Sequence, residues 1–345
     1  MRIDIWTHLL SPAYVQHLKS SADGGRGSFF LSQRALHDVD FRLRLAEDHG
    51  DYRQVLTPLP ALLVFDAHTM EEGTAFAEVV RQNNDELAAI ADRHGDRFVG
   101  FVGATPIADP DAATEEAVRC IRELGALGVQ LEADAVGVPL HEDRYKPLFA
   151  AIEQLGAAIW LHPCRTPERP GFAPDTIPFM LWQVLGWPFD TTIAIAKLIF
   201  SGIYDRHPDL KLIAHHGGGV IPHLSGRIER MPLLAGLDPS GSLVGALDLL
   251  ERKPIDYFRL LYVDTAMFGG EHGVRCVADF FGRDRVLFGT DAPFDAQAGS
   301  YFIPRTTADV EGAIETAADR DAIFHGNAQR VLRISKIRAD PSGAG

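Results

Sequence analysis

Short apolar runs alternate with helical patterns along most of the chain. Eight of these runs have the pattern of buried strands: 2–6, 54–59, 98–102, 128–131, 158–161, 210–214, 258–264 and 286–288. Apolar residues at helical spacing fill most of the intervals between them, as in 71–94 and 191–204. Strands that alternate with helices build parallel sheets. The pattern therefore predicts an α/β protein, a single (β/α)₈ TIM barrel with a small insertion.

The predicted barrel domain covers residues 1–335 and leaves 336–345 as a flexible tail. Residues 232–254 form a small insertion with some helix. Residues 9–36 have no regular pattern, and 165–187 are rich in Pro, Trp and Phe. A long loop inside a compact domain is usually functional, so we expect 165–187 to cover a site.

The amino-acid composition of the chain argues against several classes of function. The net charge is −14 and 46% of residues are hydrophobic, and the chain has no Lys/Arg cluster, so no nucleic-acid surface is expected. No apolar run approaches the roughly 20 residues of a membrane span, and no signal-peptide pattern opens the chain. The cysteines Cys120, Cys164 and Cys276 form no CxxC motif, which argues against a disulfide framework or a cysteine zinc site. We expect a cytoplasmic enzyme without a membrane partner.

Four of the predicted strands end at side chains that can bind metals or move protons. These side chains are His8, His162, the pair His215 and His216, and Asp291. In a parallel barrel the carboxyl ends of all strands lie on one face. Imidazoles and a carboxylate can hold a divalent metal and leave positions open for water and substrate. The sequence therefore predicts a catalytic metal site on this face.

The glycine triplet 217–219 that follows a predicted strand could suggest phosphate binding at a helix start. Neither GxGxxG nor GxxxxGK[ST] occurs, which makes this indication weak. The chain also lacks the GxSxG motif of serine hydrolases. We expect no organic cofactor.

Several segments of the chain resemble those of a known family. The segments IDIWTH, QNNDELA, LHP, DTTIAI, HGGG, FGTDAPF and HGNAQRVL run almost from end to end. They are similar to the amidohydrolase superfamily, and more narrowly to the α-amino-β-carboxymuconate-ε-semialdehyde decarboxylase family of metal-dependent decarboxylases. This resemblance implies a TIM barrel of the metal-dependent hydrolase type. The stretch 191–227 carries the most specific part of this resemblance.

The resemblance implies roles for particular residues. His8, His162 and Asp291 fall on the family's metal ligands, and His216 falls on its catalytic histidine, so that His216 and Asp291 are the expected catalytic pair. Arg227 falls on an arginine that reaches the substrate carboxylate of the neighbouring subunit, which implies a homodimer. The expected metal is Zn²⁺, with Mn²⁺ as the alternative.

The chain departs from the family at Trp6, where the family has His or Glu. An indole has no lone pair for a metal, so three outcomes are open: the metal keeps three ligands and waters, another side chain replaces the missing ligand, or metal binding is weak or absent. Trp6 is also a candidate to stack on a substrate ring, with simple packing as the equal alternative.

Two further departures follow the sixth predicted strand. Neighbouring strand residues point to opposite sides, so His215 is expected to face away from the site; turned inward, it could be the replacement ligand. Gly219 stands where hydroxybenzoate-decarboxylating relatives often have Glu, which favours the muconate-semialdehyde subgroup.

Other candidates lie in the predicted loops. Glu132 follows the fourth predicted strand and is expected to be solvated, with a role in the site as the alternative. The remaining candidates for substrate binding are the pocket-lining residues Arg165, Trp182 and Trp187 and the possible carboxylate clamps Arg34, Arg42 and Arg44.

Together these observations predict a metal-dependent, non-oxidative decarboxylase of an unsaturated or aromatic carboxylic acid. In the hypothesised mechanism the metal lowers the pKa of water, His216 moves the proton, and CO₂ leaves. One alternative is a hydrolase or hydratase of a cyclic or unsaturated acid on the same barrel, since fold does not decide the reaction. The other is a degenerate barrel without metal that acts as a binding or assembly protein.

Overall fold

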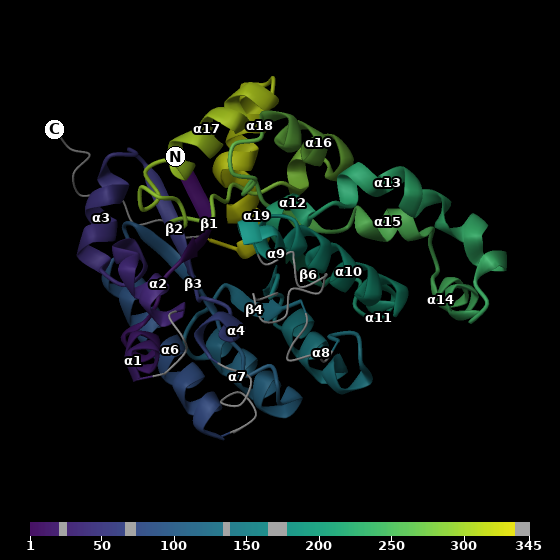
Figure 1. The fold of residues 1–345 in the computed structure, drawn as a ribbon, viewed down its shortest axis with the longest axis horizontal. Helices are drawn as coiled ribbons and strands as arrows, with labels where there is room; N and C mark the ends of the chain where they lie inside the picture. The colour runs from purple at the N-terminus through teal and green to yellow at the C-terminus, as the bar shows by residue number, and fades with distance from the viewer. Residues whose placement is uncertain (21–25, 66–73, 134–138, 165–177, 335–345) are drawn as a thin grey trace.

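A computed structural model of the chain describes residues 1–20, 26–65, 74–133, 139–164 and 178–334. The predicted tail, 336–345, lies outside the described residues. Seven parallel strands form one sheet in the order β1-β2-β3-β4-β5-β6-β7, with helices around them (Figure 1). The strands are β1 (Arg2–His8), β2 (Tyr52–Thr57), β3 (Phe98–Gly103), β4 (Gly128–Glu132), β5 (Ala158–His162), β6 (Lys211–Ala214) and β7 (Tyr262–Val263). The predicted parallel α/β architecture is confirmed.

The helices of the first half of the chain are α1 (Pro12–Ser20), α2 (Arg26–Ser32), η1 (Arg34–Leu36), α3 (Val39–Glu47), α4 (Ala61–Val64), α6 (Thr74–Arg93), α7 (Pro110–Arg122), η2 (Asp143–Tyr145) and α8 (Lys146–Gln154). Those of the second half are η4 (Pro178–Met180), α9 (Leu181–Val184), α10 (Gly186–Phe200), α11 (Ile203–Arg206), α12 (His215–Gly218), α13 (Ile221–Arg230), η5 (Met231–Leu237), α14 (Ser242–Leu249), α15 (Pro254–Phe258), α16 (Glu271–Phe281), η6 (Arg283–Arg285), α17 (Phe302–Ala313), α18 (Ala317–Asp321), η7 (Ala322–Gly326) and α19 (Asn327–Leu332). None of the helices in the described part of the chain could span a membrane.

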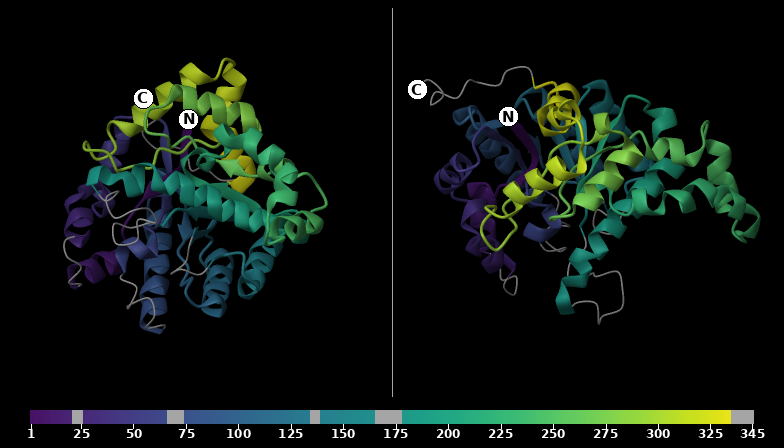
Figure 2. Two further views of the ribbon diagram at one scale, coloured as in Figure 1. Left: turned by 45° about the vertical axis from the view of Figure 1, so that its right-hand side comes forward. Right: turned by 90° about the horizontal axis from the view of Figure 1, so that it is seen from above.

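Three sequence predictions need correction. The stretch 9–36 was expected to be irregular, but it contains α1, α2 and η1. The predicted strand 258–264 is shorter, because α15 extends to Phe258 and β7 covers only Tyr262–Val263; Pro254 suits the first turn of that helix. The described end of the predicted loop 165–187 is helical from residue 178. The predicted insertion does contain helix, and α14 projects from one side of the body (Figures 1 and 2).

The sheet curves strongly. Trp160 on β5 donates a hydrogen bond from Nε1 to the carbonyl oxygen of Ile5 on β1, at 3.0 Å, although three strands separate β1 from β5 in the sheet order. Every residue of β2, β4 and β5 is buried, as expected for parallel strands covered on both faces.

The eighth predicted strand, 286–288, is not a strand in the structure and forms one isolated bridge, between Val286 and Val263, but its segment contacts both edges of the sheet. Leu287 donates its N–H to Val263 on β7 at 2.8 Å, and Phe288 accepts from Ile5 on β1 at 3.0 Å. Farther along, Ala292 accepts from the N–H of His8 at 2.9 Å. These bonds place Asp291 beside the carboxyl end of β1, where His8 lies.

Candidate metal and catalytic site

The carboxyl end of β1 supplies Trp6 and His8, two residues apart and therefore on the same side of the strand. Both side chains are fully buried. His8 Nδ1 lies 2.9 Å from the carbonyl oxygen of Pro58. A carbonyl can only accept a hydrogen bond, so Nδ1 carries the proton and Nε2 presents its lone pair to the interior.

His162 at the end of β5 has the same arrangement. Its Nδ1 lies 2.5 Å from the carbonyl oxygen of Pro163, which leaves Nε2 without a proton. Burial, and then the charge of His215, hold the pKa of His162 well below its usual value. His162 is therefore a neutral imidazole, the form that binds metals.

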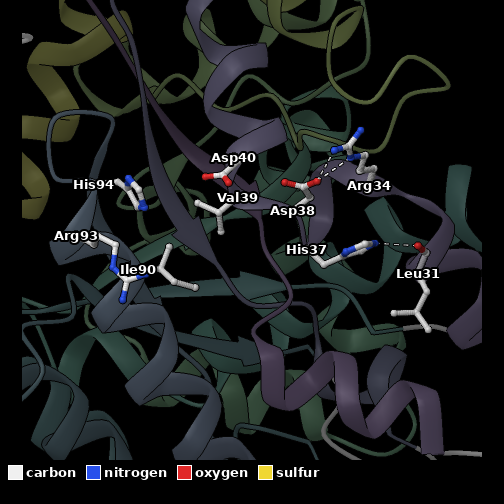
Figure 3. A pocket seen from close by; sticks show the side chains of 9 residues that line it. All are labelled: Leu31, Arg34, His37, Asp38, Val39, Asp40, Ile90, Arg93 and His94. Atoms are coloured by element: carbon white, nitrogen blue, oxygen red, sulfur yellow. Dashed lines mark hydrogen bonds and ion pairs between the residues drawn. The ribbon is translucent and has the colours of Figure 1, made fainter.

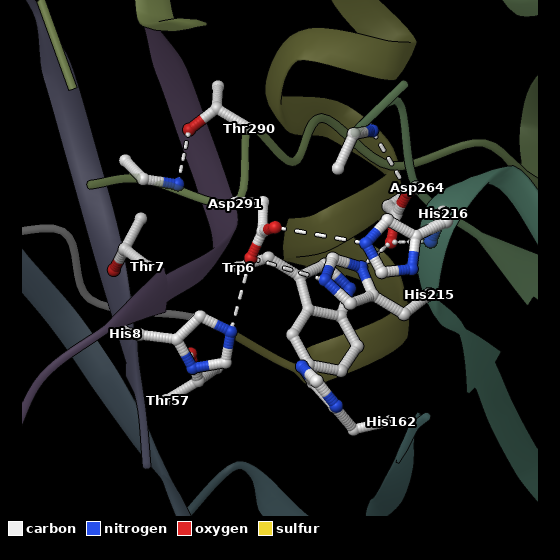
Figure 4. Close-up of polar contacts among 12 residues, drawn as sticks. Trp6, Thr7, His8, Thr57, His162, His215, His216, Asp264, Thr290 and Asp291 are labelled. Atoms are coloured by element: carbon white, nitrogen blue, oxygen red, sulfur yellow. Dashed lines mark hydrogen bonds and ion pairs between the residues drawn. The ribbon is translucent and has the colours of Figure 1, made fainter. Parts of the chain in front are cut away.

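The turn after β6 presents two adjacent histidines to the site (Figure 4). His216 has φ 53° and ψ 52°, and Gly217 continues with φ 62°. This left-handed backbone breaks the alternation of a strand, so both His215 and His216 face inward, and their rings stack with centroids 3.8 Å apart. The expectation that His215 faces away from the site is wrong for this reason.

Asp291 is the common partner of these histidines. Its Oδ1 lies 3.2 Å from Nε2 of His8 and 3.3 Å from Nε2 of His215. Its Oδ2 lies 3.7 Å from Nε2 of His216. Burial opposes the charge of Asp291, but the close approach and the charge of His215 hold the pKa of this carboxyl well below its usual range. Asp291 is therefore an ionised carboxylate at neutral pH.

The same atoms test whether a divalent metal fits here. Nε2 of His8, Nε2 of His215 and Oδ1 of Asp291 are buried and have no hydrogen-bond partner. Ligand atoms of His8, His162 and His215 lie within 4.8 Å of one another, as do those of His215, His216 and Asp291. Buried polar atoms without partners are rare in proteins. Their convergence in a set of imidazoles and one carboxylate suits Zn²⁺ or Mn²⁺.

Two carboxylates outside the predicted set hold the site in place. Asp264, directly after β7, accepts from His215 Nδ1 at 2.5 Å. Asp4 on β1 accepts from the N–H of Thr290 at 3.1 Å and from its hydroxyl at 2.5 Å, which fixes the residue before Asp291. Asp264 follows an apolar run, and Asp4 is an acid inside one. Both signals were readable in the sequence.

Most of the predicted substrate residues lie at a distance from the histidines or outside the described residues. Trp182 is half-buried on α9, with its ring 5.7 Å from that of Trp187. Trp187 itself lies 5.6 Å from the ring of His162 and 6.0 Å from that of His216. Arg227 is exposed on α13, and Arg165 lies outside the described residues. Trp6 stacks on His215, with centroids 3.9 Å apart.

The three arginines proposed as carboxylate clamps have different surroundings. Arg34 lines a surface hollow of about 730 Å³ that contains none of the histidines described above (Figure 3), and its guanidinium pairs with Asp38 at 2.7 Å. Arg44 is exposed. Arg42 is buried and donates to Gln54 at 2.6 Å and to the carbonyl oxygen of His8. Arg42 therefore supports the end of β1.

Glu132, the last residue of β4, is buried rather than solvated as expected. Its Oε1 accepts from the N–H of Ala61 at 2.9 Å, and its Oε2 has no hydrogen-bond partner. Burial raises the pKa of Glu132 to about 7. Its register partner on β5 is His162, so it lies beside the candidate site.

This burial predicts a pH-dependent stability. The pKa of Glu132 is higher in the folded chain than its usual 4.5, so its contribution to stability is fully present below pH 4.5 and is lost as pH rises through about 7. The Glu132→Gln variant should lack this loss. Between pH 5 and pH 8.5 the wild-type free energy of unfolding should fall by about 2 kcal/mol more than that of the variant. Denaturant unfolding at both pH values measures the free energy of unfolding of each protein. The same change between the two pH values in wild type and variant would contradict the prediction. Glu123→Gln, at an exposed carboxylate, should match the wild type.

Comparisons with known proteins show which proteins this chain is similar to. The profile of the family described as "Amidohydrolase" matches residues 3–334. A gamma-resorcylate decarboxylase of Rhizobium radiobacter is 30% identical over 337 residues, covering 93% of this chain and 96% of the relative. A 2-amino-3-carboxymuconate-6-semialdehyde decarboxylase of Dictyostelium discoideum is 28% identical, covering 85% and 82%. The crystal structure of a dihydroxybenzoic acid decarboxylase from Polaromonas sp. JS666, with bound manganese and the inhibitor 2-nitroresorcinol, aligns with a TM-score of 0.76 at 25% identity over 97% of each chain.

Proposed function

Because this chain belongs to the amidohydrolase family, we propose that it is a metal-dependent, non-oxidative decarboxylase of an aromatic or unsaturated carboxylic acid. The observation that carries the proposal is the convergence of metal-binding side chains: ligand atoms of His8, His162 and His215 lie within 4.8 Å of one another, and Nε2 of His8 lies 3.2 Å from Oδ1 of Asp291. They come from strand ends far apart in the sequence, and the buried ligand atoms of His8 and Asp291 have no hydrogen-bond partner. The decarboxylase relatives at 30% and 28% identity support the reaction type.

His8, His162 and Asp291 would hold the ion. Neutral imidazoles and a carboxylate suit Zn²⁺, which we expect, and Mn²⁺, which the Polaromonas enzyme contains. A divalent ion in this position supplies Lewis-acid chemistry: it withdraws charge from an oxygen ligand and favours its ionised form. The protein contributes the fixed positions of the ligands, set by Pro58, Pro163 and the segment around Thr290.

His216 is the proposed carrier of the proton. Its Nδ1 is buried without a partner, and burial, followed by the charge of His215, lowers the pKa of His216 below its usual value. A neutral imidazole in a closed site can take a proton and give it up again. In the reaction the bond between the substrate carbon and its carboxylate breaks, and the electron pair stays on that carbon. His216, which first takes a proton from solvent water, gives that proton to the same carbon, and CO₂ leaves.

Aromatic side chains around the histidines favour a flat, unsaturated substrate. Trp187 and Phe268 lie 6.0 and 5.8 Å from the ring of His216, and Phe294 lies 5.4 Å from the ring of His8. A glutamate side chain does not fit at position 219. Gly219 has φ 68°, and an added Cβ would lie 2.3 Å from the carbonyl oxygen of Pro188. This supports a substrate whose decarboxylation needs no acid group there.

The substrate carboxylate requires a cation, and we propose Arg227 of a neighbouring subunit in a homodimer. Arg227 is exposed on α13, and η5 and α14 follow directly with large exposed apolar side chains. These are Leu233, Leu234, Leu237, Val244 and Leu249. A contiguous exposed apolar patch commonly marks a protein interface.

The bonds from Leu287 and Phe288 to both edge strands support a closed (β/α)₈ TIM barrel, and we infer one domain from residue 1 to 335.

The test is CO₂ release from 2,6-dihydroxybenzoate and from muconate-semialdehyde-type acids, with protein reconstituted with Zn²⁺ or Mn²⁺. The rival hydrolase or hydratase uses the same residues, and a reaction in ¹⁸O-labelled water separates the two. Decarboxylation releases CO₂ and puts no label on the product carbon, whereas hydrolysis or hydration puts ¹⁸O into the product. No CO₂ release from any acid of either class would defeat the proposal. A purified protein that binds no metal would instead favour the non-enzymatic alternative.

A further inference from the structure

The first strand supplies one uncommitted metal ligand, His8, because the carboxylate of Asp4 already accepts hydrogen bonds from Tyr52 and Thr290. Trp6 occupies the inward position two residues before His8, is fully buried, and its Nε1 has no hydrogen-bond partner. An indole N–H can donate a hydrogen bond but offers no lone pair to a metal. The ring is tightly enclosed, because a Cβ added at Gly289 would lie 3.0 Å from Trp6 Cδ1. Trp6 therefore fills a ligand position without acting as a ligand.

The ring of His215 lies directly against this indole. The two ring centroids are 3.9 Å apart and the planes are inclined by only 16°. His215 is fully buried, and its Nε2 is directed at Oδ1 of Asp291, 3.3 Å away (Figure 4). Stacking on Trp6 fixes the plane of the imidazole and leaves its Nε2 directed into the cluster.

The other nitrogen of His215 is fixed as metal-binding histidines usually are. Nδ1 donates to Oδ2 of Asp264 at 2.5 Å. Asp264 is held in turn by the N–H groups of His216, Gly217 and Ala266, at 3.0, 2.9 and 2.9 Å. A carboxylate that accepts from the outer nitrogen of a ligating histidine sets its tautomer and its orientation. His8 and His162 have carbonyl oxygens in the same role.

The separations agree with a shared ion. Two atoms each about 2.1 Å from one metal lie roughly 3.0–3.4 Å apart at angles between 90° and 109°. The distances from Asp291 Oδ1 to Nε2 of His8 and of His215 are 3.2 and 3.3 Å. His215 also belongs to both groups of converging ligand atoms, the one with His8 and His162 and the one with His216 and Asp291.

We propose that His215 is a metal ligand that replaces the one missing at Trp6, giving the set His8, His162, His215 and Asp291. This inference rests on the metal site of the proposed function. His216 is outside the set, because its Nε2 faces the other oxygen of Asp291 at 3.7 Å. In this set the turn after β6 supplies the ligand that β1 lacks at Trp6, and the indole of Trp6 stacks on the imidazole of His215 and fixes its orientation.

The test measures metal affinity. Protein stripped with a chelator is titrated with Mn²⁺, and the free ion is followed by electron paramagnetic resonance. The His215→Phe variant keeps a ring to stack on Trp6 but removes the lone pair. Its Kd for Mn²⁺ should rise at least about 100-fold, since disturbing only the partner of a ligand already costs 10–100-fold. His216→Asn, the adjacent control, should bind Mn²⁺ as the wild type does.

His215→Phe leaves Asp264 and Asp291 without their shared partner, so a measurement on the wild-type protein accompanies it. In ¹¹³Cd-loaded protein with ¹⁵N-labelled histidine, the number of ring nitrogens coupled to the metal gives the imidazole ligands directly. Three coupled nitrogens support the inference, and two overturn it. An unchanged Mn²⁺ affinity in folded His215→Phe also overturns it, since His215 would then only pair Asp264 with Asp291. A wild-type protein that binds no metal would instead refute the proposed function.

Discussion

Replacing His216 with asparagine is expected to lower kcat for CO₂ release by about 10²–10⁴-fold, the usual contribution of a positioned acid or base, while the bound metal stays in place. His216 is the only imidazole among the described site histidines that lies beside Oδ2 rather than Oδ1 of Asp291. Its Nδ1 has no partner, so it is free to exchange a proton with substrate. Asparagine removes that capacity.

The choice of asparagine keeps the backbone intact. His216 has φ 53° and ψ 52°, a left-handed conformation that asparagine adopts more readily than most residues. The matched control is His223→Asn, at an exposed position on α13, which should keep full activity. Steady-state kinetics and metal analysis of both variants check the expectation. Wild-type kcat in His216→Asn would remove His216 from the mechanism.

Replacing Asp291 with asparagine should abolish both metal binding and activity. The carboxylate faces His8 at 3.2 Å and His215 at 3.3 Å, so it contributes the negative charge around which the imidazoles gather. An asparagine has the same shape and tolerates the φ of 63° at this position, but its amide carries no charge. We expect metal content to fall below about a tenth of an equivalent and CO₂ release to fall by about 10³-fold or more.

Measurement of metal by plasma emission spectroscopy, together with the CO₂ assay, checks this second expectation. Asp321→Asn, which removes an exposed carboxylate at the end of α18, is the control and should match the wild type in both assays. Retention of a full equivalent of metal by Asp291→Asn would show that the carboxylate is not a ligand. Retained activity with no metal would show that the reaction does not need one.

Strand ends made most of the site predictable. The run AIWLH is short, apolar and buried, and it ends at His162. The same pattern marks His8 on β1. The rings of His8 and His162 lie 5.3 Å apart and His8 lies 3.2 Å from Asp291, as expected for strand ends on one face of a parallel barrel. These predictions depended only on the side to which the carboxyl ends of strands point, which is set by the backbone and not by details of packing.

His215 could not be oriented in this way. The alternation of side chains holds only within a strand, and β6 ends at Ala214. The positive φ values of His216 and Gly217 that follow are a property of the turn, which the letters HHGGG permit but do not require. Glu132 was misjudged for a related reason, because whether a strand-end side chain is covered depends on segments from elsewhere in the chain, here the start of α4 at Ala61.

Anomalous diffraction tests the central claim most directly. Crystals of the wild-type protein grown with Zn²⁺ or Mn²⁺ would be measured on both sides of the absorption edge of that metal. The account predicts one strong peak within about 2–2.5 Å of the side chains of His8, His162 and Asp291. A map with no peak there, from protein that releases CO₂ in the same solution, would contradict it.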